Sequence, residues 1–150
     1  MDAPVEIDTV LVPIDGSDES LEAVEYGVAI AGRYDAVIHV VYVLGDEVNR
    51  AIAAGVVDEE EVVAESQAMF ETVGDRAAAA AVSMTHSIAY GFSQQRLTVH
   101  PGSVILDSAE QIDADFLVIP RESGRQASAD VLEKAAEYVL LYASQPVLSV

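Results

Sequence analysis

Short runs of apolar, mostly β-branched residues alternate along the chain with longer segments in which apolar residues recur at helical spacing. Near-continuous apolarity is typical of strands that are buried on both faces of a parallel sheet. The predicted strands of this kind lie at residues 10–14, 37–43, 116–119 and 146–150. Because strands that alternate with helices are joined by right-handed crossovers, we predict an α/β fold with a doubly wound, mostly parallel sheet and helices on both faces.

The predicted helices begin at residues suited to that position. Ser17 is placed to cap the helix after the first strand, and Gly32 to help end it. A long helix is predicted from about Asp58, because acidic residues fill its first turn. Ser103 is predicted to open the next helix, and the last helix is predicted to begin at about Ser128.

Two segments have less definite patterns. The stretch between the second strand and Asp58 is interpreted as a looser connection without a predicted element. Residues 84–99 allow two interpretations, of which the first is a pair of short strands at 88–90 and 97–99 separated by a turn at Gly91. The second is one strand followed by an irregular loop.

The length and composition favour one compact domain. With 150 residues, of which 51% are apolar, the chain suits a single domain over residues 1–150, and it shows no repeat or linker. The absence of cysteine excludes disulfides, thiolate catalysis and cysteine-based zinc sites. Neither an apolar run of about 18 residues nor a secretory signal is found, so a cytoplasmic protein without membrane contact is expected.

The charge balance is strongly acidic. Twenty-six acidic residues against seven basic ones give a formal net charge of −19, which disfavours nucleic acid and anionic lipid as partners. The acids are scattered through a hydrophobic, periodic sequence, unlike those of a disordered acidic tail. Because salt screens the self-repulsion of such a surface, the composition favours a source with a salt-rich cytoplasm, as in a halophilic archaeon.

Three blocks of sequence add a more specific signal. Residues 10–17 read Val-Leu-Val-Pro-Ile-Asp-Gly-Ser, residues 38–41 read Ile-His-Val-Val, and residues 114–150 contain a strand, a helix and a closing strand without a gap. This ordered set resembles the universal stress protein family. The resemblance implies a five-stranded parallel sheet and a homodimer paired through the last strands, here Pro146 to Val150. It also implies two classes, of which one binds ATP.

One loop distinguishes the two classes. As the resemblance implies, ATP-binding members have a glycine after the fourth strand, a second glycine three residues on, and a Gly-Ser or Gly-Thr pair after nine more. This chain has Pro120, Ser123 and the pair Glu133-Lys134 at those places. Proline removes a backbone N–H, and Glu133 adds negative charge where phosphates would lie. The motif is therefore degenerate and no cofactor is expected, although a shifted loop could use Gly124.

The resemblance also implies an adenosine half of the site. Pro13, Ile14 and Asp15 match positions that hold the adenosine in the family, and Val40 matches another. Asp15 has an alternative role, because an aspartate after a strand commonly organises the turn by accepting hydrogen bonds from backbone N–H groups. The turn role is the favoured interpretation.

Other chemistry finds little support in the sequence. His39, His86 and His100 show no short metal-ligand spacing, so no metal site is predicted, and His39 is expected to be a packed strand residue with one hydrogen-bond partner. His100 precedes Pro101 and is expected to belong to a turn. The chain lacks the GxGxxG, Walker A and GxSxG patterns, so no catalytic residue is predicted.

Three of the seven basic residues lie near the degenerate loop. Arg121, Arg125 and Lys134 motivate the hypothesis that the loop binds a smaller or differently placed anion, such as a nucleoside monophosphate, because guanidinium groups hold phosphate without a glycine cradle. Pairing of these bases with nearby glutamates is the favoured alternative.

The sequence thus supports two functions of different classes. The leading expectation is a homodimeric stress-response protein that acts by association with an unknown protein partner and catalyses no reaction. The alternative is a regulatory module that binds ATP or AMP through a remodelled loop. A subunit of a transporter or of another enzyme is a third possibility, for which no partner-specific motif is found.

Overall fold

The computed structural model describes residues 5–44, 46–90, 101–120 and 130–150. In chain order its elements are β1 (Thr9–Ile14), α1 (Asp18–Tyr34), β2 (Val37–Leu44), α2 (Asp46–Ala53), α3 (Glu59–Ala79), β3 (Met84–Tyr90), α4 (Pro101–Gln111), β4 (Phe116–Ile119), α5 (Asp130–Tyr142) and β5 (Val147–Ser149). The expected alternation of strands and helices is confirmed.

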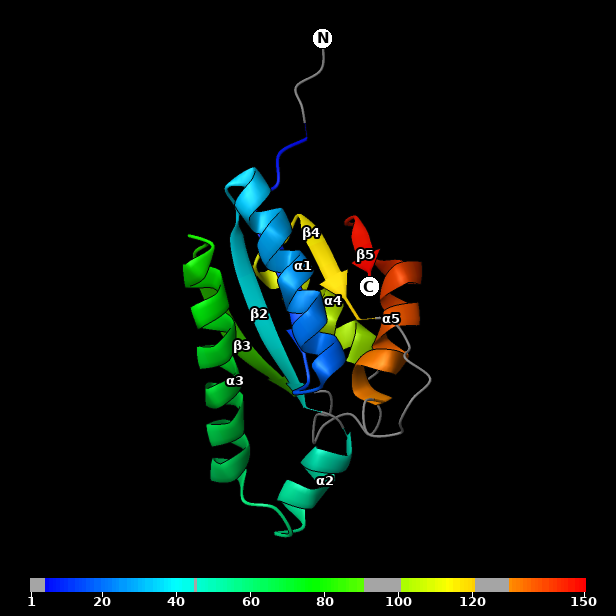
Figure 1. The fold of residues 1–150 in the computed structure, drawn as a ribbon. Helices are drawn as coiled ribbons and strands as arrows, with labels where there is room; N and C mark the ends of the chain where they lie inside the picture. The colour runs from blue at the N-terminus through cyan, green and yellow to red at the C-terminus, as the bar shows by residue number, and fades with distance from the viewer. Residues whose placement is uncertain (1–4, 45, 91–100, 121–129) are drawn as a thin grey trace.

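The strands form one five-stranded sheet in the order β3-β2-β1-β4-β5, and every neighbouring pair is parallel. The chain builds the sheet outward from β1 to β3, then crosses back to place β4 on the other side of β1 (Figure 1). The direction of winding therefore reverses between β1 and β4. In parallel sheets of this kind ligands bind beyond the carboxyl ends of the strands at that reversal.

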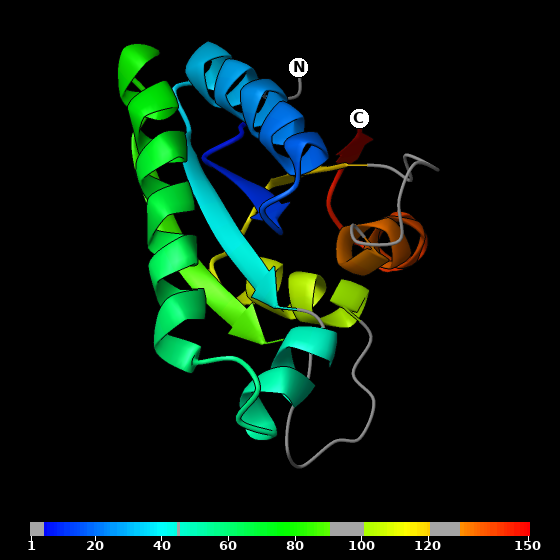
Figure 2. The same cartoon turned by 60° about the horizontal axis from the view of Figure 1, so that its bottom comes forward.

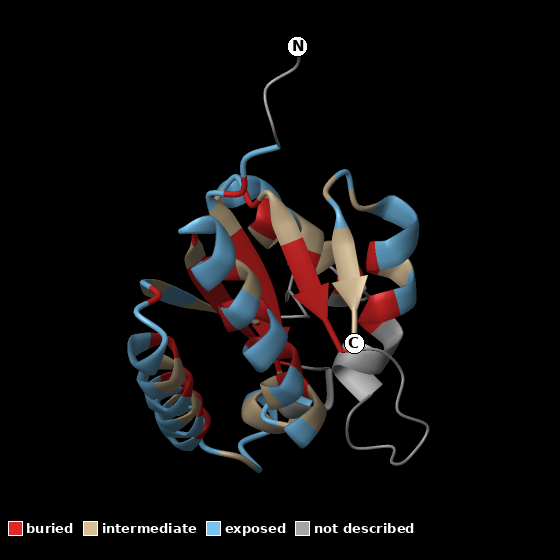
Figure 3. Ribbon diagram, turned by 45° about the horizontal axis from the view of Figure 1, so that its top comes forward, coloured by how far each residue is buried: buried red, intermediate tan, exposed pale blue. Residues whose placement is uncertain are grey.

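Helices cover both faces of the sheet. Figure 2 shows α1 and α3 on one face and α4 and α5 on the other, which gives the molecule two hydrophobic cores. Alternate residues of β1 serve the two cores: Val10, Val12 and Ile14 pack toward α1 and α3, whereas Leu11 packs toward α4 and α5. Because both faces of the central strands are buried (Figure 3), their sequences are apolar without interruption.

Helix α1 shows how local sequence sets the element boundaries. The Ser17 hydroxyl accepts a hydrogen bond from the Ser20 amide at 3.2 Å, which confirms the predicted N-cap. The helix continues past Gly32 to Tyr34 and ends at Asp35, whose φ of 56° is left-handed. The prediction that Gly32 helps to end the helix was therefore wrong, because aspartate also tolerates this conformation.

The structure assigns a regular element to each of the two segments whose sequence pattern is less definite. Residues 46–53, expected to be a loose connection, form α2. Of the two interpretations of residues 84–99, the structure has a single strand over Met84–Tyr90, and the proposed strand at 97–99 lies outside the described residues. Helix α4 begins at Pro101, two residues before the predicted Ser103, because a first helical position needs no N–H donor. Ser128 lies outside the described residues.

Candidate functional site

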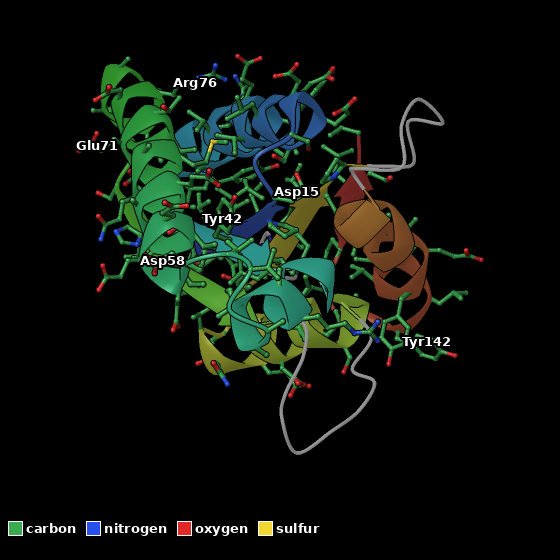
Figure 4. The ribbon with its side chains drawn as sticks, turned by 90° about the horizontal axis from the view of Figure 1, so that it is seen from below. Asp15, Tyr42, Asp58, Glu71, Arg76 and Tyr142 are labelled. Carbon is green, nitrogen blue, oxygen red and sulfur yellow. The ribbon has the colours of Figure 1, made fainter. Side chains whose placement is uncertain are left out.

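The candidate site lies at the carboxyl edge of the sheet, where β1 and β2 end. The parallel register places Ile14 opposite Tyr42, so the two strands finish side by side. Figure 4 views the molecule from this end and shows Asp15 and Tyr42 near the middle of it. This edge also borders the reversal between β1 and β4, which is the expected ligand position in the fold.

Asp15 organises the turn between β1 and α1. Its Oδ1 accepts a hydrogen bond from the Ser17 amide at 2.9 Å, and Gly16 between them has a left-handed φ of 88°. The predicted turn role is therefore confirmed. Asp15 is only half-buried, and within the described residues its Oδ2 accepts no hydrogen bond. One carboxylate oxygen is thus committed to the turn, and the other remains able to accept a bond from a ligand.

Tyr42 is the neighbour of this turn; the segment from His39 to Tyr42 is a place where the sequence predicts ligands to bind, but it assigns Tyr42 no role of its own. Its hydroxyl lies 3.2 Å from the position that a Cβ on Gly16 would occupy, and its ring packs edge-on against Phe70 with centroids 6.3 Å apart. Burial raises the pKa of Tyr42, and the carboxylates of Glu65 and Asp15 raise it further. At neutral pH the phenol therefore keeps its proton and is a potential hydrogen-bond donor at this edge.

The other predicted adenosine residues lie deeper than Asp15. Pro13 and Ile14 are buried near the end of β1. Val40 is fully buried opposite Val12, and its side chain belongs to the core between the sheet and helices α1 and α3. Of these four residues, only Asp15 has side-chain surface at the carboxyl edge.

Of the segment from Pro120 to Lys134, which corresponds to the phosphate-binding loop of the family, the structure describes residue 120 and residues 130–134. Pro120 is buried directly after β4, and Glu133 and Lys134 belong to α5. Arg121 and Arg125, proposed as anion contacts, lie outside the described residues, as do Ser123 and Gly124, the glycine that a shifted loop could use.

The described histidines are structural. His39, expected to have one hydrogen-bond partner, has two: its Nδ1 is 2.6 Å from Thr85 Oγ1 and its Nε2 is 2.9 Å from Ser87 Oγ. That expectation was wrong because β3, not identified as a long strand from sequence, lies beside His39 and supplies both hydroxyls. Burial lowers the pKa of His39, and nearby His86 lowers it further. His86 stacks on Phe70 with centroids 4.2 Å apart, and His100 lies outside the described residues.

The described residues hold neither a candidate metal site nor a candidate membrane span. In the part of the chain that the structure describes, no group of three or more histidines and carboxylates is arranged to hold a metal ion. Among the described helices, none combines the length and the apolar content needed to cross a lipid bilayer.

An apolar surface occupies the C-terminal edge of the sheet. Strand β5 pairs with β4 through Leu117 opposite Val147, and its residues are only partly buried. Beside it, the end of α5 exposes Leu140, Leu141 and Tyr142, of which Leu141 is 69% exposed. Figure 4 shows Tyr142 directed away from the body of the molecule. We call these three residues and the outer edge of β5 the C-terminal surface.

Known proteins resemble this chain over nearly its whole length. The Universal stress protein family matches residues 6–150. Universal stress protein MJ0531 of Methanocaldococcus jannaschii is 27% identical over 141 residues, which cover 94% of this chain and 80% of that protein.

Solved structures show the same fold. The hypothetical protein MJ0577 aligns with a TM-score of 0.77 and 16% identity, covering 97% of this chain and 96% of the other. A universal stress protein in complex with cAMP aligns with a TM-score of 0.68 and 23% identity, covering 97% and 98%.

Proposed function

Because the chain belongs to the universal stress protein family, we propose that it is a homodimeric regulatory protein of the cytoplasm that acts by association and catalyses no reaction. The observation that carries this proposal is the C-terminal surface, where the end of α5 exposes Leu140, Leu141 and Tyr142 and the outer edge of β5 pairs with no described strand. Exposed apolar side chains beside an open strand edge favour pairing with another surface. A second copy placed edge to edge would extend the sheet and cover these residues.

The degenerate loop supports association without a bound triphosphate. Pro120 follows β4 where the ATP-binding class has glycine, and Glu133 brings a negative charge to the start of the last helix. A carboxylate near a helix start competes with phosphate for the same backbone N–H groups. We therefore propose that this protein belongs to the class that does not use ATP.

Sedimentation velocity tests the dimer. We expect the native protein to sediment as a dimer at micromolar concentration in high salt, and the Leu141→Lys variant to sediment as a monomer, because the added charge would be buried in the interface. Val56→Lys is the matched control, since Val56 is 79% exposed between α2 and α3, far along the chain from the C-terminal surface. A native monomer, or equal dissociation of both variants, would contradict the proposal.

The alternative function is binding of an adenine nucleotide at the carboxyl edge. Two observations favour it: Asp15 Oδ2 is free to accept a bond among the described residues, and a universal stress protein of the same fold was solved with cAMP. Tyr42 would supply a hydroxyl beside Asp15, and Arg121, Arg125 and Lys134 are the proposed phosphate contacts in place of a glycine cradle.

Calorimetry with ATP, ADP, AMP and cAMP in high-salt buffer separates the two functions. The leading proposal expects no saturable heat from any of the four. Saturable binding that is lost in Asp15→Ala and in the double charge reversal of Arg121 and Arg125 would establish the alternative. Asp15→Asn is the control for the turn, because its amide oxygen can still accept the Ser17 amide.

A further inference from the structure

In the part of the chain that the structure describes, strand β3 is the other edge of the sheet, and no strand pairs with its outer backbone groups. Within the described residues β3 pairs with β2 alone. The Ile38 amide donates to the Ser83 carbonyl at 2.9 Å, which fixes the phase of this parallel ladder. Because bonds of a parallel ladder come from alternate residues, the N–H and C=O groups of Met84, His86 and Ile88 point away from β2. This edge can accept another strand.

A groove runs beside the same edge, between β3 and α3. It has a volume of about 470 Å³ and is lined by Gln67, Phe70, Glu71, Gly74, Met84 and His86, which we call the β3 groove. Its floor is the stacked pair of Phe70 and His86. Gly74 keeps the groove open, since a side chain there would extend toward the Met84 sulfur, which lies 3.8 Å from the position of a Cβ.

The charge around the β3 groove selects its occupant. Glu71 is exposed on the rim, where Figure 4 shows it at the outer side of α3. Arg76, the only basic residue of α3, is paired with Glu25 at 2.9 Å. Glu71 therefore gives the rim of the β3 groove a negative charge that no described basic residue neutralises, so a cationic segment would be attracted there.

We propose that the β3 edge binds an extended, basic segment of a partner protein as an added sixth strand. Side chains of a strand alternate between the two faces of the sheet, so every second residue of the segment enters the β3 groove. Arginine suits that position, because its aliphatic stem and guanidinium plane pack on Phe70 and His86 while its charge reaches Glu71. Residues between the arginines face exposed Thr85, where threonine pairs well across strands.

A peptide of about ten residues that alternates arginine and threonine is the probe. Its binding is measured by fluorescence anisotropy at the lowest salt at which circular dichroism shows the protein folded. We expect Glu71→Lys to weaken binding about tenfold. The matched control is Glu110→Lys, which changes the net charge equally at an exposed position of α4 on the opposite face of the sheet. Equal weakening by both variants would mean that the peptide responds only to the net charge of the protein, which would overturn the proposal.

Two further measurements test strand addition itself. The same peptide with alternate backbone amides methylated keeps its charge but cannot form the ladder, so we expect it not to bind. Hydrogen exchange should show new protection of the amides of Met84, His86 and Ile88 when the unmethylated peptide binds. Binding without that protection overturns the proposal. Protection of these amides that grows with protein concentration in the absence of peptide also overturns it, since a second copy would then occupy the edge.

Discussion

Gly16 is the residue on which the geometry of the β1–α1 turn depends. It has a φ of 88°, and a Cβ at this position would lie 3.2 Å from the Tyr42 hydroxyl. We expect Gly16→Ala to lower the free energy of unfolding by about 1–3 kcal/mol, measured by urea denaturation. Gly55→Ala is the matched control, because Gly55 has a φ of 75° but nothing within 4 Å of the added carbon.

The comparison isolates the contact with Tyr42. Both variants carry the strain of an alanine at positive φ, so the extra loss in Gly16→Ala measures crowding against the phenol. Removing the hydroxyl with Tyr42→Phe should then recover part of that loss. Equal destabilisation of the Gly16 and Gly55 variants would show that Tyr42 does not restrict the turn.

His39 gives the protein a stability that depends on pH. Burial holds the pKa of His39 below 6.5 in the folded protein. As the pH falls below 6.5, the unfolded chain binds a proton that the folded chain does not, so the free energy of unfolding decreases until the folded pKa is reached. Titration of the His39 ring by NMR should show a midpoint below 6.5, and His39→Gln should remove this part of the acid destabilisation. A midpoint at or above 6.5 would contradict the burial argument.

Two glycines of helix α1 differ in how closely the helix backbone approaches its neighbours. A Cβ on Gly27 would lie 2.6 Å from Val12 Cγ2, whereas a Cβ on Gly32 would lie 3.6 Å from Val82, an ordinary contact. In the interior of a helix, alanine is more favourable than glycine by about 1 kcal/mol. We therefore expect Gly32→Ala to raise the melting temperature and Gly27→Ala to lower it, because Val12 is fully buried and cannot move aside. Increases in both variants would mean that α1 shifts freely over β1.

The strands that could be predicted from sequence are those whose side chains reach both cores. The apolar runs at β1, β2, β4 and β5 are distinctive because their side chains enter two cores. Edge strand β3 was ambiguous because it places Thr85, His86 and Ser87 in succession, and these polar residues are explained only by their partners in β2 and α3. Helix α2 was missed although Val48 and Ile52 recur at helical spacing, because an apolar pattern over only eight residues is short for a helix.

Within the candidate site, a residue whose role follows from the local sequence could be predicted, whereas a residue placed by the pairing of strands could not. Asp15 could be identified because an aspartate after a strand bonds to its own turn. The contact of Tyr42 with Gly16 could not be predicted, since it follows from the pairing of β1 with β2. Val40 shows the converse: its position along β2 puts its side chain in the core. Sequence similarity identifies the strand but not the depth of a residue in it.

At the scale of the whole molecule, charge is the dominant property. The formal net charge is −19, and the ion pair between Arg76 and Glu25 lies at the surface, so it offsets little of the mutual repulsion among acids. The two cores favour the folded chain, whereas this repulsion opposes any compact state. We propose that the protein is adapted to a salt-rich cytoplasm, in which screening allows the cores to determine stability.

The free energy of unfolding should therefore depend on the salt concentration. The Debye length falls from about 10 Å at 0.1 M to about 3 Å at 1 M, so the free energy of unfolding should rise steeply with KCl over that range and more slowly above it. Replacing exposed Glu22, Glu71 and Glu110 by glutamine should raise stability at low salt and flatten the rise, because fewer like charges remain to be screened. Urea denaturation across the KCl series measures both effects. If the triple variant gains stability with salt as steeply as the native protein, then exclusion of salt from the surface, rather than screening, stabilises the fold.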